Sequence, residues 1–265
     1  MKHALNITTS LLASTYRFWR GTMASKTVKQ PEGSLLLFDQ EGNADCRLVR
    51  EVLTELNLDV VIRPCPADGK NIKELHAKFD KVTLPILIDI NHSVAANGAK
   101  EVIDHLFSQY KGTNPPRSLI TKLSNNLTSQ LATGIRLGAG RKARPARQAE
   151  QPLILYSFES SPYTRPVRER LCELELTYIL INLGKQQVSD MGPATFRWSV
   201  KPYRPLPNTK RDDFFKLHGN VQIPYLMDPN TNIDMFESKD ILRYLERTYA
   251  IHNIEDCQLL ANNLG

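Results

Sequence analysis

The chain repeats itself, and this repeat limits the folds it can adopt more than any other feature. The 24 residues from Leu35, LLLFDQEGNADCRLVREVLTELNL, share 11 identities with the 24 residues from Leu153, LILYSFESSPYTRPVRERLCELEL. A second pair of segments also matches without a gap, namely VTLPILIDIN around Pro85 and VQIPYLMDPN around Pro224. Because each copy of such a repeat is expected to fold as one unit, we predict two domains of the same architecture in the 265 residues.

The segments that precede these blocks correspond as well. SLLASTYRFWRG from Ser10 resembles SQLATGIRLGAG from Ser129. We expect each segment to form an amphipathic helix that packs on the domain it precedes. The predicted divisions are a lead-in and basic connector over 1–33, domain one over 34–112, a second helical lead-in and basic linker over 113–151, domain two over 152–252 and a tail over 253–265.

The N-terminus is basic and has no acidic residue before position 32, which is also typical of an organellar transit peptide. The same kind of segment recurs in mid-chain, where it cannot be a cleaved address, and this favours a structural helix. We therefore expect a cytoplasmic protein, with an organellar address as the alternative. The sequence has no run of 18 or more apolar residues, so we expect no membrane span.

The cysteines and the charge exclude several classes of site. Four scattered cysteines without C-x-x-C or metal-ligand spacing suit a reducing compartment, and from them we expect neither a disulfide framework nor a metal site. The net charge of +6 includes a basic cluster within 136–147. No aromatic RNA-binding motif accompanies this cluster, so we expect a solvated linker rather than a nucleic-acid contact.

The second repeat shows the order of its elements most clearly. Its short apolar runs predict strands, and Pro162 and Ser238 are placed to begin helices. The expected strands cover 153–156, 178–181, 223–227 and 233–236. The resulting order, β-α-β, a connection, then β-β-α, is that of the thioredoxin fold. We therefore predict an α/β protein with two tandem thioredoxin-like domains.

Three motifs of the second repeat make the prediction more specific. SSPYTRPVRERL from Ser160 resembles the start of the active-site helix of glutaredoxins and glutathione transferases. QIPYL around Pro224 resembles their cis-proline strand, and MFESKDILRYLE from Met235 resembles their Glu-Ser glutathione motif. The motifs occur in family order, so both repeats resemble the N-terminal domain of the glutathione transferase superfamily.

The resemblance implies a glutathione site in domain two. Ser161 stands where the family places the residue that contacts the glutathione sulfur, which makes it the candidate catalytic residue; the alternative is a helix cap. A cis bond before Pro224 would expose the main chain of Ile223, unless this is an ordinary edge-strand proline. The remaining implied ligand-binding residues are Tyr163, Thr164, Glu237 and Ser238, of which the last two could instead be a plain capping pair.

Domain one departs from these motifs except at Pro85. Gly98 and Ala99 replace the Glu-Ser pair, and Cys46 aligns with Thr164, the position of a resolving thiol. We interpret domain one as a structural or partner-binding copy, with a reactive Cys46 at a helix start as the alternative.

Domain two has 21 additional residues before its proline, within Met191–Phe215. Long loops of this kind are often functional. Arg197 or Lys201 could bind the glycyl carboxylate of glutathione, or the loop could be a surface for a protein partner.

The implied function is glutathione binding by domain two, with or without a weak glutathione-dependent transferase or redox activity at Ser161. Only 16 residues follow Tyr249, so we do not expect the helical domain that normally supplies the transferase substrate site. The alternative is a non-catalytic thioredoxin-fold module that binds a protein partner.

Overall fold

The computed structural model describes residues 2–26, 28–116, 122–136, 138–199 and 201–252, so the expected tail and Cys257 lie outside it. The lead-in helices are α1 (Lys2–Tyr16) and α6 (Lys122–Ile135). Domain one contains β1 (Leu35–Asp39), α2 (Ala44–Glu55), β2 (Val60–Pro64), α3 (Lys70–Lys78), β3 (Ile86–Asp89), β4 (Val94–Asn97), α4 (Ala99–Leu106) and the π-helix η1 (Phe107–Lys111). Domain two contains β5 (Leu153–Ser157), α7 (Arg165–Glu173), β6 (Tyr178–Asn182), the 3-10 helix η2 (Val188–Asp190), α8 (Lys210–His218), β7 (Tyr225–Asp228), β8 (Ile233–Phe236) and α9 (Ser238–Tyr249).

The strands of both domains join in one eight-stranded sheet with the order β4-β3-β1-β2-β6-β5-β7-β8. Within each domain the first two strands are parallel and the last two form an antiparallel hairpin, as the thioredoxin fold requires. The domains meet where β2 pairs antiparallel with β6, with Val60 opposite Leu180 and Ile62 opposite Tyr178. The sequence predicted the two domains but not this shared sheet.

The two faces of the sheet carry different helices. Alternation along β1 sends Leu35 and Leu37 into a large core with α2, α4, α7 and α9, and this core continues across both domains. Phe38 faces the opposite side, where α3 covers domain one, while α8 covers the corresponding face of domain two.

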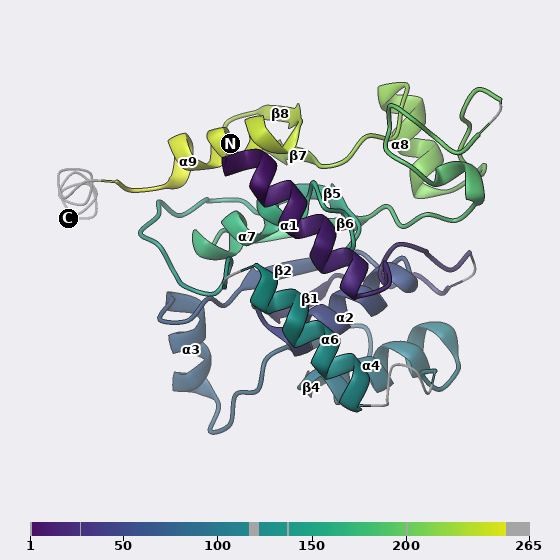
Figure 1. The fold of residues 1–265 in the computed structure, drawn as a ribbon. Coiled ribbons are helices and arrows are strands. Elements are labelled where there is room, and N and C mark those ends of the chain that lie inside the picture. The colour runs from purple at the N-terminus through teal and green to yellow at the C-terminus, as the bar shows by residue number, and fades with distance from the viewer. Residues whose placement is uncertain (1, 27, 117–121, 137, 200, 253–265) are drawn as a thin grey trace.

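Each lead-in helix packs on the opposite domain, and not on the domain that it precedes in the sequence. α1 packs against α6 and α7, and α6 packs against α1 and α2, so each helix lies on the first helix of the other domain (Figure 1). Arg165 of α7 donates to the main-chain oxygen of Ser10 at 2.8 Å, and Arg47 of α2 donates to that of Ser129 at 2.7 Å. Both serines are fully buried, since their small side chains allow the helices to approach closely. The prediction that each lead-in packs on its own domain was wrong.

The expected solvated linker is also wrong in part. Arg136 is buried and forms a bidentate pair with Glu169, at 2.7 and 2.5 Å. Arg144 pairs with Glu246 at 2.6 Å. These basic side chains are therefore bound to carboxylates of domain two and are part of the fold.

Two element boundaries differ from the prediction. Residues 162–164 form a turn, and α7 begins only at Arg165. The end of the expected long loop is helical, because Thr209 caps α8 by accepting from the Asp212 N–H. In the described ranges no helix combines the length and the apolar character needed to cross a bilayer.

A buried network of ion pairs, formed by Glu41, Arg50, Glu159 and Arg168, joins the two domains. Glu41 and Glu159 occupy equivalent positions, and each lies between Arg50 and Arg168. Arg50 Nε lies 3.0 Å from Glu159 Oε2, and Arg168 Nη2 lies 3.1 Å from Glu41 Oε1. Burial alone would raise the pKa of Glu159, but the guanidinium groups of Arg168 and Arg50 outweigh it and hold this pKa at about 2.

Replacing Glu159 by Gln should strongly destabilise the protein. The substitution leaves Arg50 and Arg168 buried with less compensating charge, and breaking a buried pair typically costs about 3–5 kcal/mol. Urea denaturation at neutral pH measures the change. Glu150→Gln, at an exposed carboxylate, is the matched control and should change stability by less than about 0.5 kcal/mol. Equal effects of the two variants would contradict a structural role for the network.

The pH dependence of the wild type and Glu159→Gln should also differ. The pKa of Glu159 is lowered from 4.5 to about 2 in the folded protein. Its carboxylate therefore contributes stability above about pH 4.5, and this contribution is lost as the pH falls toward 2. Between about pH 5 and about pH 3 the wild type should lose more unfolding free energy than the variant. Parallel curves would show that Glu159 is not held ionised by the network.

Candidate functional site

The three predicted site segments leave the sheet at the same end. Tyr156 of β5 lies opposite Tyr225 of β7, which in turn lies opposite Phe236 of β8. The loop after β5, the bend before β7 and the turn after β8 are therefore neighbours. A hydrogen bond of 2.6 Å from Gln222 Nε2 to Glu237 Oε1 joins the last two directly.

The bend before β7 presents unpaired main chain. The Ile223–Pro224 bond is cis, as is Leu84–Pro85 in domain one, in agreement with the resemblance. Among the described residues, neither the N–H nor the C=O of Ile223 has a hydrogen-bond partner. The Ile223 side chain is partly buried and belongs to the α8-side core, which fixes the direction of this edge. An extended peptide could pair with it as an added strand.

The turn after β8 places a carboxylate beside this edge. Glu237 has a φ of 65°, in the left-handed region, and its side chain is exposed. Ser238 is the first residue of α9 and is buried. The N-terminus of a twelve-residue helix carries partial positive charge and favours a bound carboxylate. The Glu237 carboxylate, which can bind a cation, and the N-terminus of α9, which can bind an anion, thus lie side by side next to the Ile223 main chain.

Ser161 occupies a different environment from the one expected. Its side chain is only 1% exposed, and its Oγ accepts from the Thr164 N–H at 3.3 Å and from the Thr164 hydroxyl at 3.0 Å. Thr164 is fully buried, while Tyr163 between them is 43% exposed. Ser161 therefore closes the turn 162–164 and does not cap α7, whose N-cap residue is Thr164.

The C-terminal end of α1 and the segment that follows it cover the loop before α7. Ser14 Oγ donates to the Ser160 main-chain oxygen at 2.8 Å, and the Ser160 N–H donates to the Gly21 oxygen at 3.1 Å. The hydroxyls of Thr22 and Ser160 are also hydrogen bonded. These contacts hold Ser160 directly before Ser161, and a thiol could reach the buried Ser161 side chain only if this cover moved.

Arg197 and Lys201 of the long loop are placed differently from each other. The Arg197 guanidinium donates to the main-chain oxygens of Asp190, Gly192 and Val221, which ties the loop to the segment just before Gln222. It also lies over the Tyr203 ring, 4.8 Å from the centroid. Lys201 is exposed. Arg197 therefore shapes the border of the candidate site from a position fixed by the backbone.

Domain one has no equivalent polar pair at its sheet end. Gly98 has a φ of 89°, and its N–H donates to the Pro85 oxygen at 2.8 Å. Cys46 is fully buried, and burial raises the pKa of its thiol well above the ordinary value. A buried thiol with a raised pKa is inert, so Cys46 is not the reactive cysteine that its place at a helix start allowed.

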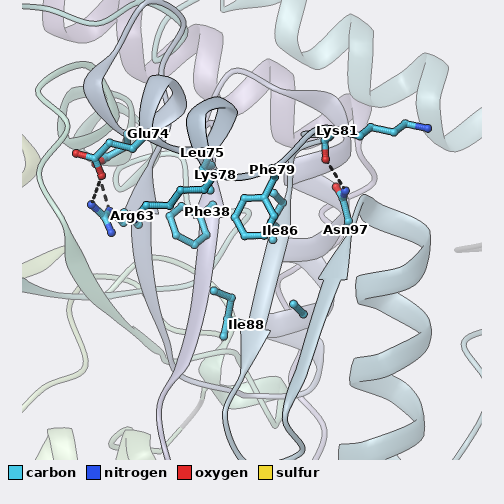
Figure 2. A pocket seen from close by; sticks show the side chains of 12 residues that line it. Phe38, Arg63, Glu74, Leu75, Lys78, Phe79, Lys81, Ile86, Ile88 and Asn97 are labelled. Carbon is cyan, nitrogen blue, oxygen red and sulfur yellow. Dashed lines mark hydrogen bonds and ion pairs between the residues drawn. The ribbon is translucent and has the colours of Figure 1, made fainter.

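A separate cavity of about 320 Å³ lies on the α3 side of domain one, between α3 and the strands (Figure 2). Figure 2 shows the rings of Phe38 and Phe79 in its middle, with the Arg63–Glu74 ion pair at one side. In domain two the equivalent face is filled by the side chains of Tyr156, Phe214 and Tyr225, whose rings meet in tilted and edge-to-face contacts. None of the predicted site residues lines the domain-one cavity.

The comparison with protein families agrees with this geometry. The family described as glutathione S-transferase, N-terminal domain, matches residues 37–114 and 155–253. The chain belongs to this family. No curated protein matched the chain, and no solved structure did. The two matched segments confirm the tandem arrangement of glutathione S-transferase N-terminal domains with a thioredoxin-like fold.

The α1 cover was the feature that sequence reasoning missed. The repeat of Ser10 as Ser129 and of Arg17 as Arg136 showed that the lead-ins are structural. It could not show which domain each helix contacts, because both domains offer the same complementary residues.

Because α1 covers Ser161, a cysteine placed at this position should react slowly with a thiol reagent. In a Cys257→Ser background, the remaining native cysteines among the described residues are buried. Ser161→Cys should then react with a small thiol reagent at least roughly 100-fold more slowly than Tyr163→Cys, since reaction needs local opening of α1. Similar rates for the two positions, followed spectroscopically, would show that the glutathione S-transferase-like helix start is open.

Proposed function

We propose that domain two binds glutathione at the Ile223 main-chain edge and the Glu237–Ser238 turn. The observation that carries the proposal is the unpaired main chain of Ile223 directly beside Glu237, at the sheet end where this family's motifs meet. Membership of the family supports the choice of ligand.

The cysteinyl main chain and the γ-glutamyl end of glutathione each find a complementary group at this end of the sheet. The cysteinyl main chain would pair with the N–H and C=O of Ile223 as a short added strand. The Glu237 carboxylate would accept from the γ-glutamyl ammonium, a charge-assisted contact. Ser238 and the N-terminus of α9 would hold the γ-glutamyl carboxylate.

The thiol is the part of glutathione that fits least well. Ser161 is sealed by α1, and its Oγ already accepts from Thr164. Thiolate activation by Ser161, and with it a transferase or redox reaction, requires α1 to leave the start of α7. We therefore propose binding as the primary function, with weak activity limited to the fraction of molecules in which α1 is displaced.

A second candidate is a non-catalytic module that binds a protein partner. The long loop exposes large aromatic side chains, with Phe196 at 72% and Trp198 at 63%. Exposed aromatic residues on a loop are typical of protein contacts. In that case the Ile223 edge would accept an extended segment of the partner instead of a tripeptide.

Calorimetry with reduced glutathione tests the first candidate. Glu237→Ala should weaken binding by about tenfold or more, because a hydrogen bond to a charged group contributes about 1.5–3 kcal/mol. Asp240→Ala is the matched control, since it removes an exposed carboxylate from the first turn of the same helix and should leave the affinity unchanged.

Two results would contradict glutathione binding at this site. One is the absence of heat with millimolar glutathione, which would favour the protein-binding module. The other is an equal loss of affinity in Glu237→Ala and Asp240→Ala, which would reduce the effect to general surface charge.

A further inference from the structure

Domain one contains a cluster of two histidines and an aspartate that has no role in the proposed glutathione site. Asp89 ends β3, His92 lies in the turn between β3 and β4, and His105 lies in α4. One ligand atom of each lies within 4.8 Å of those of the other two. The cluster thus joins three successive elements of the domain.

The carboxylate is oriented for two imidazoles. Asn91 donates to Asp89 Oδ1 through its main-chain N–H and its side-chain amide, both at 2.9 Å. Oδ2 is thereby turned toward His92 Nδ1 and His105 Nε2, each at 2.8 Å, and toward the Tyr110 hydroxyl at 2.7 Å. Burial acts to raise the pKa of Asp89, but the hydrogen bonds from His105 and Tyr110 hold it well below its ordinary value. The carboxylate is therefore ionised.

The repeat supplies an internal comparison for this cluster. In domain two, Asp228 has the same partners in place of Asn91 and Tyr110, namely Asn230 and Tyr249. The positions of the histidines are taken by Thr231 and Tyr244, and the Tyr244 hydroxyl donates to Asp228 Oδ2 at 2.6 Å. Hydroxyl groups are thus enough to satisfy the aspartate in this fold. The two imidazoles add a capacity for binding metal that a structural role does not require.

We propose that Asp89, His92 and His105 bind a divalent transition-metal ion, with zinc as the reference cation. Two imidazole nitrogens and one carboxylate oxygen are a ligand set that zinc accepts, with water in the remaining position. The Asn91 and Tyr110 contacts would orient the carboxylate from outside the coordination sphere, as such partners do in metal sites. His92 is partly exposed, which gives the ion a path from solvent.

Binding of an ion requires both imidazoles to move, since the three ligand atoms lie within 4.8 Å of one another, and requires each to release the proton that it donates to Asp89 Oδ2. Ligand atoms about 2.0–2.2 Å from a tetrahedral zinc ion lie roughly 3.3 Å apart. The two nitrogens lie 2.8 Å from Asp89 Oδ2, so each has to move outward by a fraction of an ångström. His92 can do so because it lies in a turn with an accessible side chain.

The cysteine spacing of the sequence gives no sign of this metal site. The pattern D-x-N-H followed by His105 crosses a turn, a strand and half a helix, so its members are not recognisable as a set from spacing. The tertiary fold brings them together.

Titration of chelator-treated, full-length protein with Zn²⁺ tests the proposal. Calorimetry should give one site per chain. The double variant His92→Thr with His105→Tyr installs the residues that domain two carries, so it should fold, and it should lose affinity by more than roughly 100-fold. His76→Ala, at an exposed histidine, should bind as the wild type does. Co²⁺ should give the visible absorption bands of a four-coordinate, tetrahedral site in the wild type but not in the double variant.

The outcomes are decisive in both directions. Saturable binding that is lost only in the double variant supports the site, and a higher Tm with Zn²⁺ in the wild type alone supports it further. Absence of binding to the wild type, or equal binding to the wild type and the double variant, would overturn the proposal. Circular dichroism of the double variant shows whether a loss of binding reflects unfolding instead, and an unfolded double variant is replaced by the single His92→Thr change, for which the same loss is required.

Discussion

Arg50 and Arg168 lie at equivalent positions of the two domains, and each contacts Glu41 of one domain and Glu159 of the other. All four side chains are at most 2% exposed, so none can be left without its partners at small cost. This reciprocal arrangement makes each domain complete the charge balance of the other. The pairing of β2 with β6 and the exchange of the lead-in helices follow the same approximate twofold relation. The domains therefore form a single structural unit and are not two independent domains joined by a linker.

The same scaffold carries different chemistry at its two ends. Domain two has Glu237 and Ser238 beside the Ile223 edge, where domain one has Gly98 and Ala99. Domain one has two histidines around Asp89, where domain two has hydroxyl side chains around Asp228. The core positions are shared, so these differences do not disturb the sheet. A duplicated domain can thus keep its packing while its surface and turn residues take on separate tasks.

The cover over Ser161 is a consequence of how the domains are joined. Because α1 packs on α7, it closes the helix start at which this family's motif is found. The Ile223 edge and the Glu237 turn lie on the neighbouring strands and stay accessible. In the proposed glutathione site this would separate binding of the peptide from activation of its thiol, which in an open site would take place together.

The sequence by itself determined the local structure and the number of domains. Leu153–Tyr156, the proline bends and the Glu237–Ser238 turn were recognisable because strand periodicity, proline and capping residues act over a few residues. The tertiary structure alone decided that α1 contacts α7, that Ser161 is buried and that Asp89, His92 and His105 meet. The physical reason is the repeat: equivalent residues such as Arg47 and Arg165 can accept either lead-in helix, so local sequence is degenerate. Only the packing of the whole chain, with its buried charges paired across the domains, selects one arrangement.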